Sequence, residues 1–465
     1  MSAPFFLLGV SIALAILALP LRSRPRLSAV IVSATSGLLG AFAVLASLDE
    51  PFVVLGASVR LDSSFTFLGR SLVLDAANRS QVGFLYLSGA FLLGASWIAP
   101  SGRRLPSMGL LIVTAVAASL MIRPFLFSSI FLEIAVMGCV FLLVTPAHQA
   151  TRGATRLLML YTLAVPALLL SGWMVESVGV TTQTPISAGN VMLLLALGFG
   201  ILMIVPPFHF WLPTTAERAG SYSLTFVVLI VQSAGLFFLL RFIDSYTWLR
   251  EDAVLFGGLR WIGAAMTLFG SLSALVQTSL ARAASYAILA DFAVVLIALG
   301  QGRAEGYQLA LALSGGRVVS VALWSLGLEL LRAHVGGDSF GELAGVGRRM
   351  RWASWSVGSG LLSMVGFPLL AGFPPRWGLL ATSLPGDTLS RMAIVLSTLL
   401  GGIMVFRWMS VLLTEAASGP EHRLDPGPRF FLASGMVMVV VIGLFPQILF
   451  PWIIRAIAGM SNLVP

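Results

Sequence analysis

The chain has 465 residues, of which 58% are hydrophobic and only 10% are charged. Its mean hydropathy of +0.96 is not reached by soluble globular proteins of this length. Apolar runs of roughly 17–25 residues, each long enough to cross the hydrocarbon core of a bilayer as a helix, recur almost from end to end. This composition excludes a soluble enzyme. The length of the runs excludes a transmembrane β-barrel, whose strands are short and alternate in polarity.

In chain order, the apolar runs predict an all-α polytopic membrane protein with about fourteen transmembrane helices. They cover residues 4–20, 28–47, 81–98, 107–122, 124–145, 155–174, 187–205, 222–242, 256–276, 284–300, 307–332, 353–371, 392–413 and 429–455. Residues 372–385 are too short for a further span and are expected to continue the twelfth helix across a break. Residues 51–80 alternate apolar and polar side chains, which predicts an extracytoplasmic β-hairpin.

The formal net charge of +9 comes from arginines that lie mostly between the apolar runs, and all 28 basic residues are arginine. If the N-terminus faces outward, fourteen arginines lie in the inner loops, nine lie on the outer side and five lie within spans. The positive-inside rule then predicts that both termini lie on the outer side. The lone Cys139 excludes an internal disulfide and a metal or redox site built from cysteines.

Two predicted spans are interrupted by proline. The seventh contains Pro206 and Pro207, and the twelfth contains Pro368, Pro374 and Pro375. Proline removes a backbone donor and clashes with the preceding turn, so each break frees carbonyl groups that need protein or water as partners. The breaks lie five spans apart, which predicts two inverted five-helix repeats, discontinuous helices 7 and 12, and a hydrated path. The plainer interpretation is that each proline only kinks its helix.

Charged side chains within apolar runs are functional candidates because burying an ionised group in hydrocarbon is costly. Glu133 lies in the middle of the fifth run, and Arg317 and Arg376 are the matching cations. For these three residues we favour a role in charge or proton movement over a structural ion pair. Asp291 and Glu329 are weaker candidates, because both are expected close enough to a span end to be partly solvated.

The stretch "GFGILMIVPPFHFWLPTTAERAG" around the first break resembles the seventh-helix motif, P-F-H-x-W-L-P, of the antiporter-like, proton-conducting subunits of respiratory complex I. Similar segments follow in the family order: "SAGLFFLLR", "RAASYAILADFAVVLIALG", "FGELAGVGRRM" and "LLSMVGFPLLAGF". The resemblance covers residues 120–380 in detail and leans towards the subunit N type. It implies two half-channels, a central polar axis, a glutamate in the fifth helix and several intramembrane lysines.

The resemblance assigns functional positions residue by residue. Glu133 matches the family glutamate, Arg317 and Arg376 fall at lysine positions, and Pro207, Phe208, His209, Trp211 and Pro213 match the broken-helix motif. His209 is either a proton relay, since histidine titrates near neutral pH, or a backbone cap. Leu202 and Gln232 stand where relatives have lysines in the seventh and eighth helices.

The absence of lysine changes the chemistry that the resemblance implies. A buried lysine can release its proton, whereas arginine stays charged under essentially all conditions. The family relay therefore cannot operate unchanged. If protons cross, we expect Glu133, His209, Asp291 and chains of water to carry them, while Arg317 and Arg376 set their proton affinities.

We predict a proton-translocating, antiporter-like membrane subunit of a complex I-type or membrane-hydrogenase-type complex. The alternatives are a subunit of a cation/proton antiporter or of a proton-driven inorganic-carbon uptake system, and a non-conducting structural subunit. The chain offers no dinucleotide-binding loop or cysteine cluster, so quinone and iron–sulfur clusters are expected only in partner subunits.

The expected partners are other membrane subunits, peripheral redox subunits and the lipid bilayer, not nucleic acid, in a bacterial cytoplasmic membrane. We divide the chain into N-terminal helices with the hairpin (1–120), a first repeat core (121–245), a second repeat core (246–415) and a C-terminal transmembrane helix (416–465).

Overall fold

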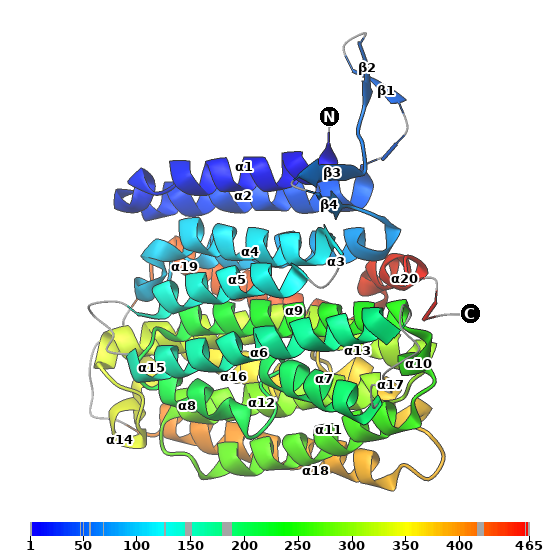
Figure 1. Cartoon of the computed structure of the whole chain (residues 1–465). Helices are drawn as coiled ribbons and strands as arrows, with labels where there is room; N and C mark the ends of the chain where they lie inside the picture. Colours follow the sequence, from blue (N-terminus) through cyan, green and yellow to red (C-terminus); the bar gives the residue numbers. More distant parts are fainter. Residues whose placement is uncertain are drawn as a thin grey trace.

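The chain folds into a bundle of long helices that run side by side (Figure 1). This computed structural model describes residues 2–46, 48–49, 51–54, 57–67, 69–124, 127–144, 151–178, 188–415, 423–460 and 462–463. The long helices are α1 (Ala3–Leu17), α2 (Pro25–Leu45), α3 (Ala76–Ala95), α4 (Leu105–Met121), α5 (Ser128–Leu143), α6 (Thr151–Val178), α7 (Ala188–Leu202), α9 (Ser221–Ser245), α11 (Ala253–Val276), α12 (Leu280–Leu299), α13 (Ala304–Val335), α16 (Arg351–Val365), α18 (Thr388–Leu413) and α19 (Pro426–Leu444). Shorter helices are α8 (Trp211–Ala216), α10 (Thr247–Arg250), α14 (Phe340–Leu343), α15 (Val346–Arg349), α17 (Phe373–Thr382) and α20 (Phe450–Ala458).

In the part of the chain that the structure describes, nine helices are long and apolar enough to cross a membrane. They lie at α2, α4, α6, α9, α11, α12, α13, α18 and α19. The other five predicted spans correspond to α1, α3, α5, α7 and α16, and four of these helices are only 15 or 16 residues long. The helical membrane architecture is confirmed, and the count of fourteen crossings stays a prediction.

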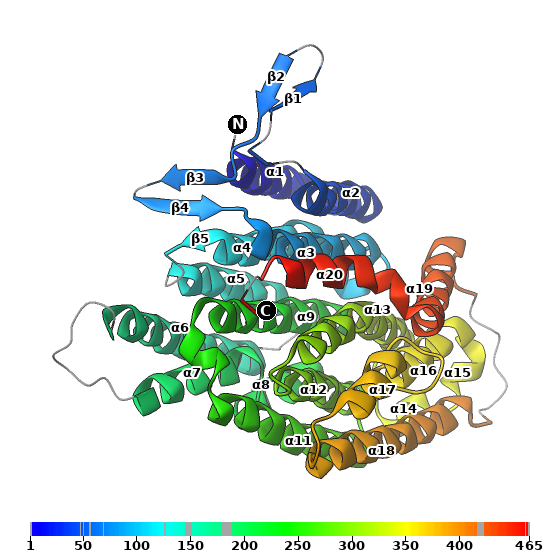
Figure 2. The same cartoon turned by 90° about the vertical axis from the view of Figure 1, so that its right-hand side faces the viewer.

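The predicted final span, residues 429–455, is not one helix. The helix α19 ends at Leu444, and Pro446 begins a short 3-10 turn that leads into α20. Figure 2 shows α20 beside α3, where Trp452 donates from its indole nitrogen to the carbonyl of Ser80 at 3.1 Å. The prediction of a continuous last helix is therefore wrong, because proline interrupts it and the following segment packs on the N-terminal helices.

Residues 51–80 form two β-hairpins and the start of a helix. The strand β1 (Pro51–Val54) pairs antiparallel with β2 (Ala57–Arg60), and β3 (Ser64–Phe67) pairs antiparallel with β4 (Arg70–Val73), to which β5 (Ile122–Arg123) is added. Asp75 then caps α3 by accepting a hydrogen bond from the N–H of Asn78. The strand prediction is confirmed, although the single expected hairpin is two and the helix begins earlier than expected.

The helices α9, α12 and α13 form the buried centre of the bundle. The sequence of α9 is apolar around its whole circumference, which is typical of a helix surrounded by protein. Within an apolar stretch of 18 residues in each helix, all residues of α9 are buried, as are 89% of those of α12 and 83% of those of α13. Candidate residues Gln232, Asp291 and Arg317 lie on these three helices.

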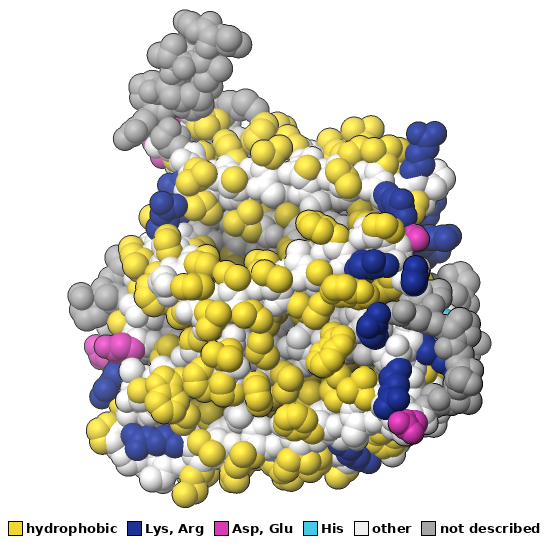
Figure 3. Space-filling view, turned by 180° about the vertical axis from the view of Figure 1, so that it is seen from behind, with side chains coloured by type: hydrophobic (Ala, Val, Ile, Leu, Met, Phe, Trp, Pro, Cys, Tyr) yellow, Lys and Arg dark blue, Asp and Glu magenta, His cyan; other side chains and the backbone are white. Residues whose placement is uncertain are grey.

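Arginine side chains gather at one end of the bundle. Seen from behind in Figure 3, most of them lie along the right-hand edge, which is the left-hand end in Figure 1. Both chain termini and the β-hairpins lie toward the opposite end (Figure 1). In these views both termini lie at the end away from most of the arginine side chains, and which side of a membrane this end faces stays a prediction.

Candidate functional site

The first helix break follows α7. The helix ends at Leu202, and the chain continues as a 3-10 turn over Phe208–Phe210 before α8 begins. The hydroxyl of Tyr161 on α6 donates to the carbonyl of Leu202 at 3.2 Å, and the N–H groups of the turn bond neighbouring carbonyls. The break predicted at Pro206 and Pro207 is confirmed, and the Tyr161 side chain satisfies the carbonyl of Leu202.

The larger cavity beside this break is apolar. It has a volume of about 390 Å³ and is lined by α7, α9, α11 and the break itself, with side chains such as Phe199, Met203 and Leu255. Its lining consists mostly of apolar side chains, so this side of the break is suited to apolar contacts. The hydrated path that the prolines suggest stays a prediction.

The second break separates α16 from α17. Ser363 holds it against α13, because its Oγ accepts a hydrogen bond from the N–H of Gly372 at 3.3 Å and lies 2.7 Å from the Oγ of Ser320. Pro374 and Pro375 occupy the first turn of α17, where proline is tolerated because no backbone N–H is needed there. The discontinuity predicted for this span is confirmed.

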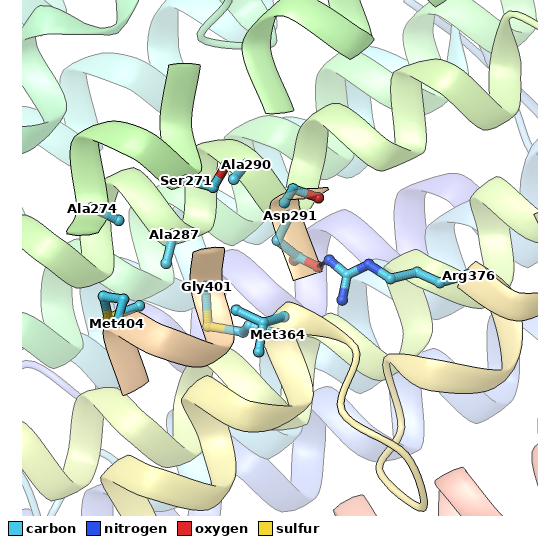
Figure 4. A pocket seen from close by; sticks show the side chains of 11 residues that line it. Ser271, Ala274, Ala287, Ala290, Asp291, Met364, Arg376, Gly401 and Met404 are labelled. Atoms are coloured by element: carbon cyan, nitrogen blue, oxygen red, sulfur yellow. Dashed lines mark hydrogen bonds and ion pairs between the residues drawn. The ribbon is translucent and has the colours of Figure 1, made fainter. Parts of the chain in front are cut away.

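Four residues predicted from the sequence meet between these central helices. The Nε of Arg317 donates to Oδ2 of Asp291 at 2.6 Å, and Nη2 of Arg376 donates to Oδ1 of the same carboxylate at 2.7 Å. The Nη2 of Arg317 also donates to Oε1 of Gln232 at 2.8 Å. These four residues, the central polar cluster, join α9, α13, α12 and α17. Figure 4 shows the Asp291–Arg376 pair.

The central polar cluster is deeply buried. Gln232 is fully buried, and Asp291, Arg317 and Arg376 are 3%, 5% and 5% exposed. Since arginine does not lose its proton, the cluster holds two positive charges and one carboxylate. Charges at this depth are tolerated only when they are paired and hydrogen-bonded. Asp291 is thus the one anion that two buried guanidinium groups share.

Two expectations about these charges are wrong. Asp291 is not partly solvated, because it lies in the middle of α12 and that helix is enclosed by its neighbours. Arg317 and Arg376 are not the counterparts of Glu133, because both bind Asp291. The pairing depends on how the helices pack, which residue spacing does not reveal.

Glu329 is also buried rather than partly solvated, with 6% exposure. Its carboxylate accepts hydrogen bonds from the N–H groups of Ser101 at 3.1 Å and Tyr222 at 3.2 Å. Tyr222 lies in the first turn of α9, where free N–H groups and the helix dipole favour an anion. This geometry supports a structural role for Glu329, which caps one helix from another.

Glu133 makes no contact with the central polar cluster. It is half-buried on α5, and its Oε1 accepts a hydrogen bond from the hydroxyl of Thr162 on α6 at 2.6 Å. Its Oε2 is buried without a partner. Among the described residues, no arginine forms an ion pair with this carboxylate.

His209 lines a polar cavity at the arginine-rich end of the bundle. The cavity has a volume of about 340 Å³ and is lined by Arg156, His209, Phe210, Pro213, Thr214, Gln277, Arg282 and Tyr286. The imidazole ring packs edge-on against Phe269 at 5.0 Å, and its Nδ1 is buried without a hydrogen-bond partner. The cap interpretation of His209 is wrong, because the ring does not bond the backbone of the break.

A second, much smaller cavity lies deeper along the same two helices, α11 and α12. Gln277 of the α11 terminus and Tyr286 of α12 line the polar cavity, whereas Ala274 and Ala287 line a space of about 10 Å³ that reaches Asp291 (Figure 4). The two cavities therefore follow one another along α11 and α12, from the arginine-rich end toward the centre.

Sequence reasoning missed the hydroxyl groups that hold these parts in place. Tyr161, Thr162, Ser320 and Ser363 each bond a residue on another helix or across a break. Serine and threonine are common in membrane helices, and most bond their own preceding turn. Nothing in the sequence separates these four from the many others.

A sequence profile of the family described as "NADH:quinone oxidoreductase/Mrp antiporter, TM" matches residues 126–401. The NADH-quinone oxidoreductase subunit N of Methylococcus capsulatus is 27% identical over 274 residues, which cover 57% of this chain and 55% of that protein. Subunit N of Desulforudis audaxviator is 26% identical over 341 residues, covering 68% of this chain and 67% of that protein. The match to the first relative spans little more than half of its length.

Solved structures share the fold over nearly the whole chain. A chain of an archaeal respiratory membrane complex, the membrane-bound sulfane sulfur reductase, superposes with a TM-score of 0.78 at 18% identity, covering 98% of both chains. A chain of the Mrp complex from Dietzia sp. gives a TM-score of 0.78 at 15% identity, covering 100% of this chain and 99% of that chain. A chain of respiratory complex I from Thermus thermophilus gives 0.75 at 19% identity, covering 98% and 100%.

Proposed function

Because the chain belongs to the NADH:quinone oxidoreductase/Mrp antiporter transmembrane family, we propose that it is a proton-translocating, antiporter-like subunit of a redox-driven membrane complex. The complex is of the respiratory complex I type or a related energy-converting type, as the similarity to subunit N proteins suggests. Quinone and iron–sulfur clusters would lie in partner subunits, and this chain would supply a path for protons.

The observation that carries the proposal is the buried carboxylate of Asp291 between two arginines, approached by cavities from the arginine-rich end. Asp291 is the only member of the central polar cluster that can take up and release a proton, since arginine and glutamine do not do so near neutral pH. Arg376 lies on the short α17, behind a break, so its guanidinium is the partner best able to withdraw. Withdrawal would leave Asp291 with a single cation and favour its protonation.

In the first half of the molecule, the proposed path uses Glu133 and His209 rather than a carboxylate paired with arginines. Glu133 carries an unpaired carboxylate oxygen and stands where the family has its fifth-helix glutamate. His209 faces the polar cavity and is placed to receive a proton from solvent at that end. Arg317 then acts as a fixed charge that couples Gln232 on α9 to Asp291 on α12.

The proposed topology has fourteen crossings in two inverted five-helix repeats, with cores at residues 121–245 and 246–415. Both termini lie outside a bacterial cytoplasmic membrane, because the arginine-rich end is expected to face the cytoplasm. Other membrane subunits pack around the chain, and peripheral redox subunits drive it.

The first experiment identifies the complex. The protein is extracted from its native membrane in mild detergent, and the co-purifying subunits are identified by mass spectrometry. Partners that carry iron–sulfur clusters support the redox-driven proposal. Co-purification with antiporter-like subunits alone, or with a carbonic-anhydrase-like protein, contradicts it and indicates ion-driven transport.

The second experiment tests conduction in that complex. Asp291→Asn and Glu133→Gln are introduced separately, and redox-driven proton uptake into proteoliposomes is compared with electron transfer in the same preparation. We expect either change to lower the number of protons moved per electron. Arg79→Gln is the control, since Arg79 bonds only backbone carbonyls near the β-hairpins. Unchanged proton uptake in both variants would favour a structural subunit.

A further inference from the structure

The central polar cluster has more positive charge and more donors than its acceptors can satisfy. Both oxygens of Asp291 are already bonded, one to each arginine. The Nε and Nη1 of Arg376 are buried and have no hydrogen-bond partner, although the side chain is only 6% exposed. Among the described residues, no other carboxylate pairs with Arg317 or Arg376. The cluster therefore carries one uncompensated positive charge in a site where such charge is costly.

The side chain of Arg376 lines a small cavity. The cavity of about 10 Å³ next to Asp291 and Arg376 is lined by two serines, two methionines and small residues of α11, α12 and α18. In Figure 4 one terminal nitrogen of Arg376 bonds Asp291, and the other points away from that carboxylate toward Met364. The unpartnered Nη1 of Arg376 thus lies on the side of Met364, one of the residues that line the cavity.

Two glycines of the break let the guanidinium of Arg376 pack closely against the backbone. A Cβ atom at Gly366 would lie 2.7 Å from Nη1 of Arg376, and one at Gly372 would lie 3.3 Å from it. Side chains at either position would displace the guanidinium. The space measured is about that of one small sphere, which excludes polyatomic anions. The flexible side chains of Met364 and Met404 allow it to widen slightly.

We propose that this cavity binds one monatomic anion of the chloride class against Arg376. A water molecule would accept hydrogen bonds from the guanidinium but would leave the positive charge uncompensated. A chloride-type anion satisfies the free donors and makes the site neutral, with two arginines balanced by Asp291 and the anion. The anion also competes with Asp291 for the same guanidinium, so its binding weakens that ion pair. The inference goes beyond proton conduction and does not depend on it.

The test measures anion-dependent stability of the full chain in its native complex. Thermal unfolding of this subunit is followed in detergent while potassium chloride replaces potassium gluconate at constant ionic strength. Gluconate is too large for the cavity and serves as the reference anion. We expect a saturable rise in Tm, on the order of 2 °C, with chloride and with bromide. Equal Tm values in all anions would overturn the proposal and leave only a bound water.

Two variants locate the effect. Arg376→Gln removes the cation and is expected to abolish the dependence on chloride. Ala287→Val keeps every charge but fills the cavity with methyl groups, so it should also abolish the dependence even if Arg376→Gln fails to assemble. Arg79→Gln is the matched control and should keep the full chloride response, because Arg79 is bonded to the carbonyls of Ala43, Val44 and Ala46. A chloride response that survives Ala287→Val would place the site elsewhere and overturn the assignment.

Crystals of the complex soaked in bromide give an independent readout. An anomalous peak within contact distance of the Arg376 guanidinium supports the site. Peaks only at the surface, together with unchanged Tm, overturn it.

Discussion

The two halves of this molecule use the same device, a helix interrupted by proline, in different electrostatic surroundings. After the break that follows α16, Arg376 binds the carboxylate of Asp291, which Arg317 also binds. Beside the break of α7, the carbonyl of Leu202 accepts a hydrogen bond from Tyr161, and Glu133 on α5 keeps one oxygen unpaired. The second half therefore holds two arginines and a carboxylate in a closed, buried network, whereas Glu133 in the first half has only the neutral Thr162 as a partner.

The two halves differ in whether a buried carboxylate has an arginine partner. A buried arginine is tolerated inside the membrane only with a permanent counterion, and Asp291 is that counterion in the second half. In the first half, among the described residues, no arginine forms an ion pair with Glu133, whose partner is the hydroxyl of Thr162. Proton exchange is consequently easier to assign to Glu133, while Asp291 must first separate from a guanidinium.

The largest effect is expected from a substitution that disrupts the central polar cluster in the second half. Asp291→Leu leaves two buried guanidinium groups without a carboxylate, and we expect a loss of about 3–5 kcal/mol in the free energy of unfolding. Denaturant unfolding in detergent micelles measures it. Glu133→Leu is the matched control, because it removes a half-buried carboxylate with one hydrogen bond. If the two substitutions cost the same, the comparison between the halves fails.

The next effect concerns the break that positions Arg376. Ser363→Ala removes the acceptor of the Gly372 N–H and the partner of the Ser320 hydroxyl, both in a buried site. Leaving such groups unsatisfied should cost about 1–3 kcal/mol in unfolding free energy. Ser434→Ala provides the control, since that exposed hydroxyl bonds only its own helix. Equal stability of the two variants would mean that the serine bridge does not hold the break.

A smaller effect is expected in the first half. Thr162→Val keeps the shape of the side chain but deprives Glu133 of its hydrogen bond. The expected loss is about 0.5–1.5 kcal/mol in the free energy of unfolding, measured in the same way. Glu133→Leu combined with Thr162→Val should show coupling between the two residues in a double-mutant cycle, because leucine removes the acceptor oxygen of the hydrogen bond. Strict additivity would indicate that the hydrogen bond contributes nothing.

The smallest effect lies outside the membrane, in the loop that carries α14. The side chain and backbone N–H of Ser339 donate to Glu342, and these bonds lower the pKa of that carboxyl below its ordinary value of 4.5. Because the folded pKa is depressed, the stabilisation is present above pH 4.5 and is lost as the pH falls through the lowered value. Ser339→Ala should shrink this acid-side dependence, as measured by unfolding at a series of pH values. An identical pH profile would contradict the assignment.

Much of the architecture can be read from the amino-acid order, because its causes are local. A helix in hydrocarbon needs a long apolar run, a proline interrupts it, and arginine is retained on one side of a bilayer. These rules predict the helical bundle and both discontinuous helices. They fail at Pro446, where the chain turns after α19, since apolarity alone does not distinguish a span from a helix that packs on a neighbour.

The contacts within the site cannot be predicted from such local rules. Local rules identify Glu133, Asp291, Arg317 and Arg376 as charges that need an explanation, because charge within an apolar run is costly wherever it occurs. They do not identify partners, since Gln232 and Arg376 are separated by 144 positions and meet only through Arg317 and Asp291. Which carboxylate pairs with which arginine depends on the packing of α9, α12, α13 and α17. That packing is a property of the folded bundle, in which close contact between helices, and not distance along the chain, determines the electrostatic neighbours of each charge.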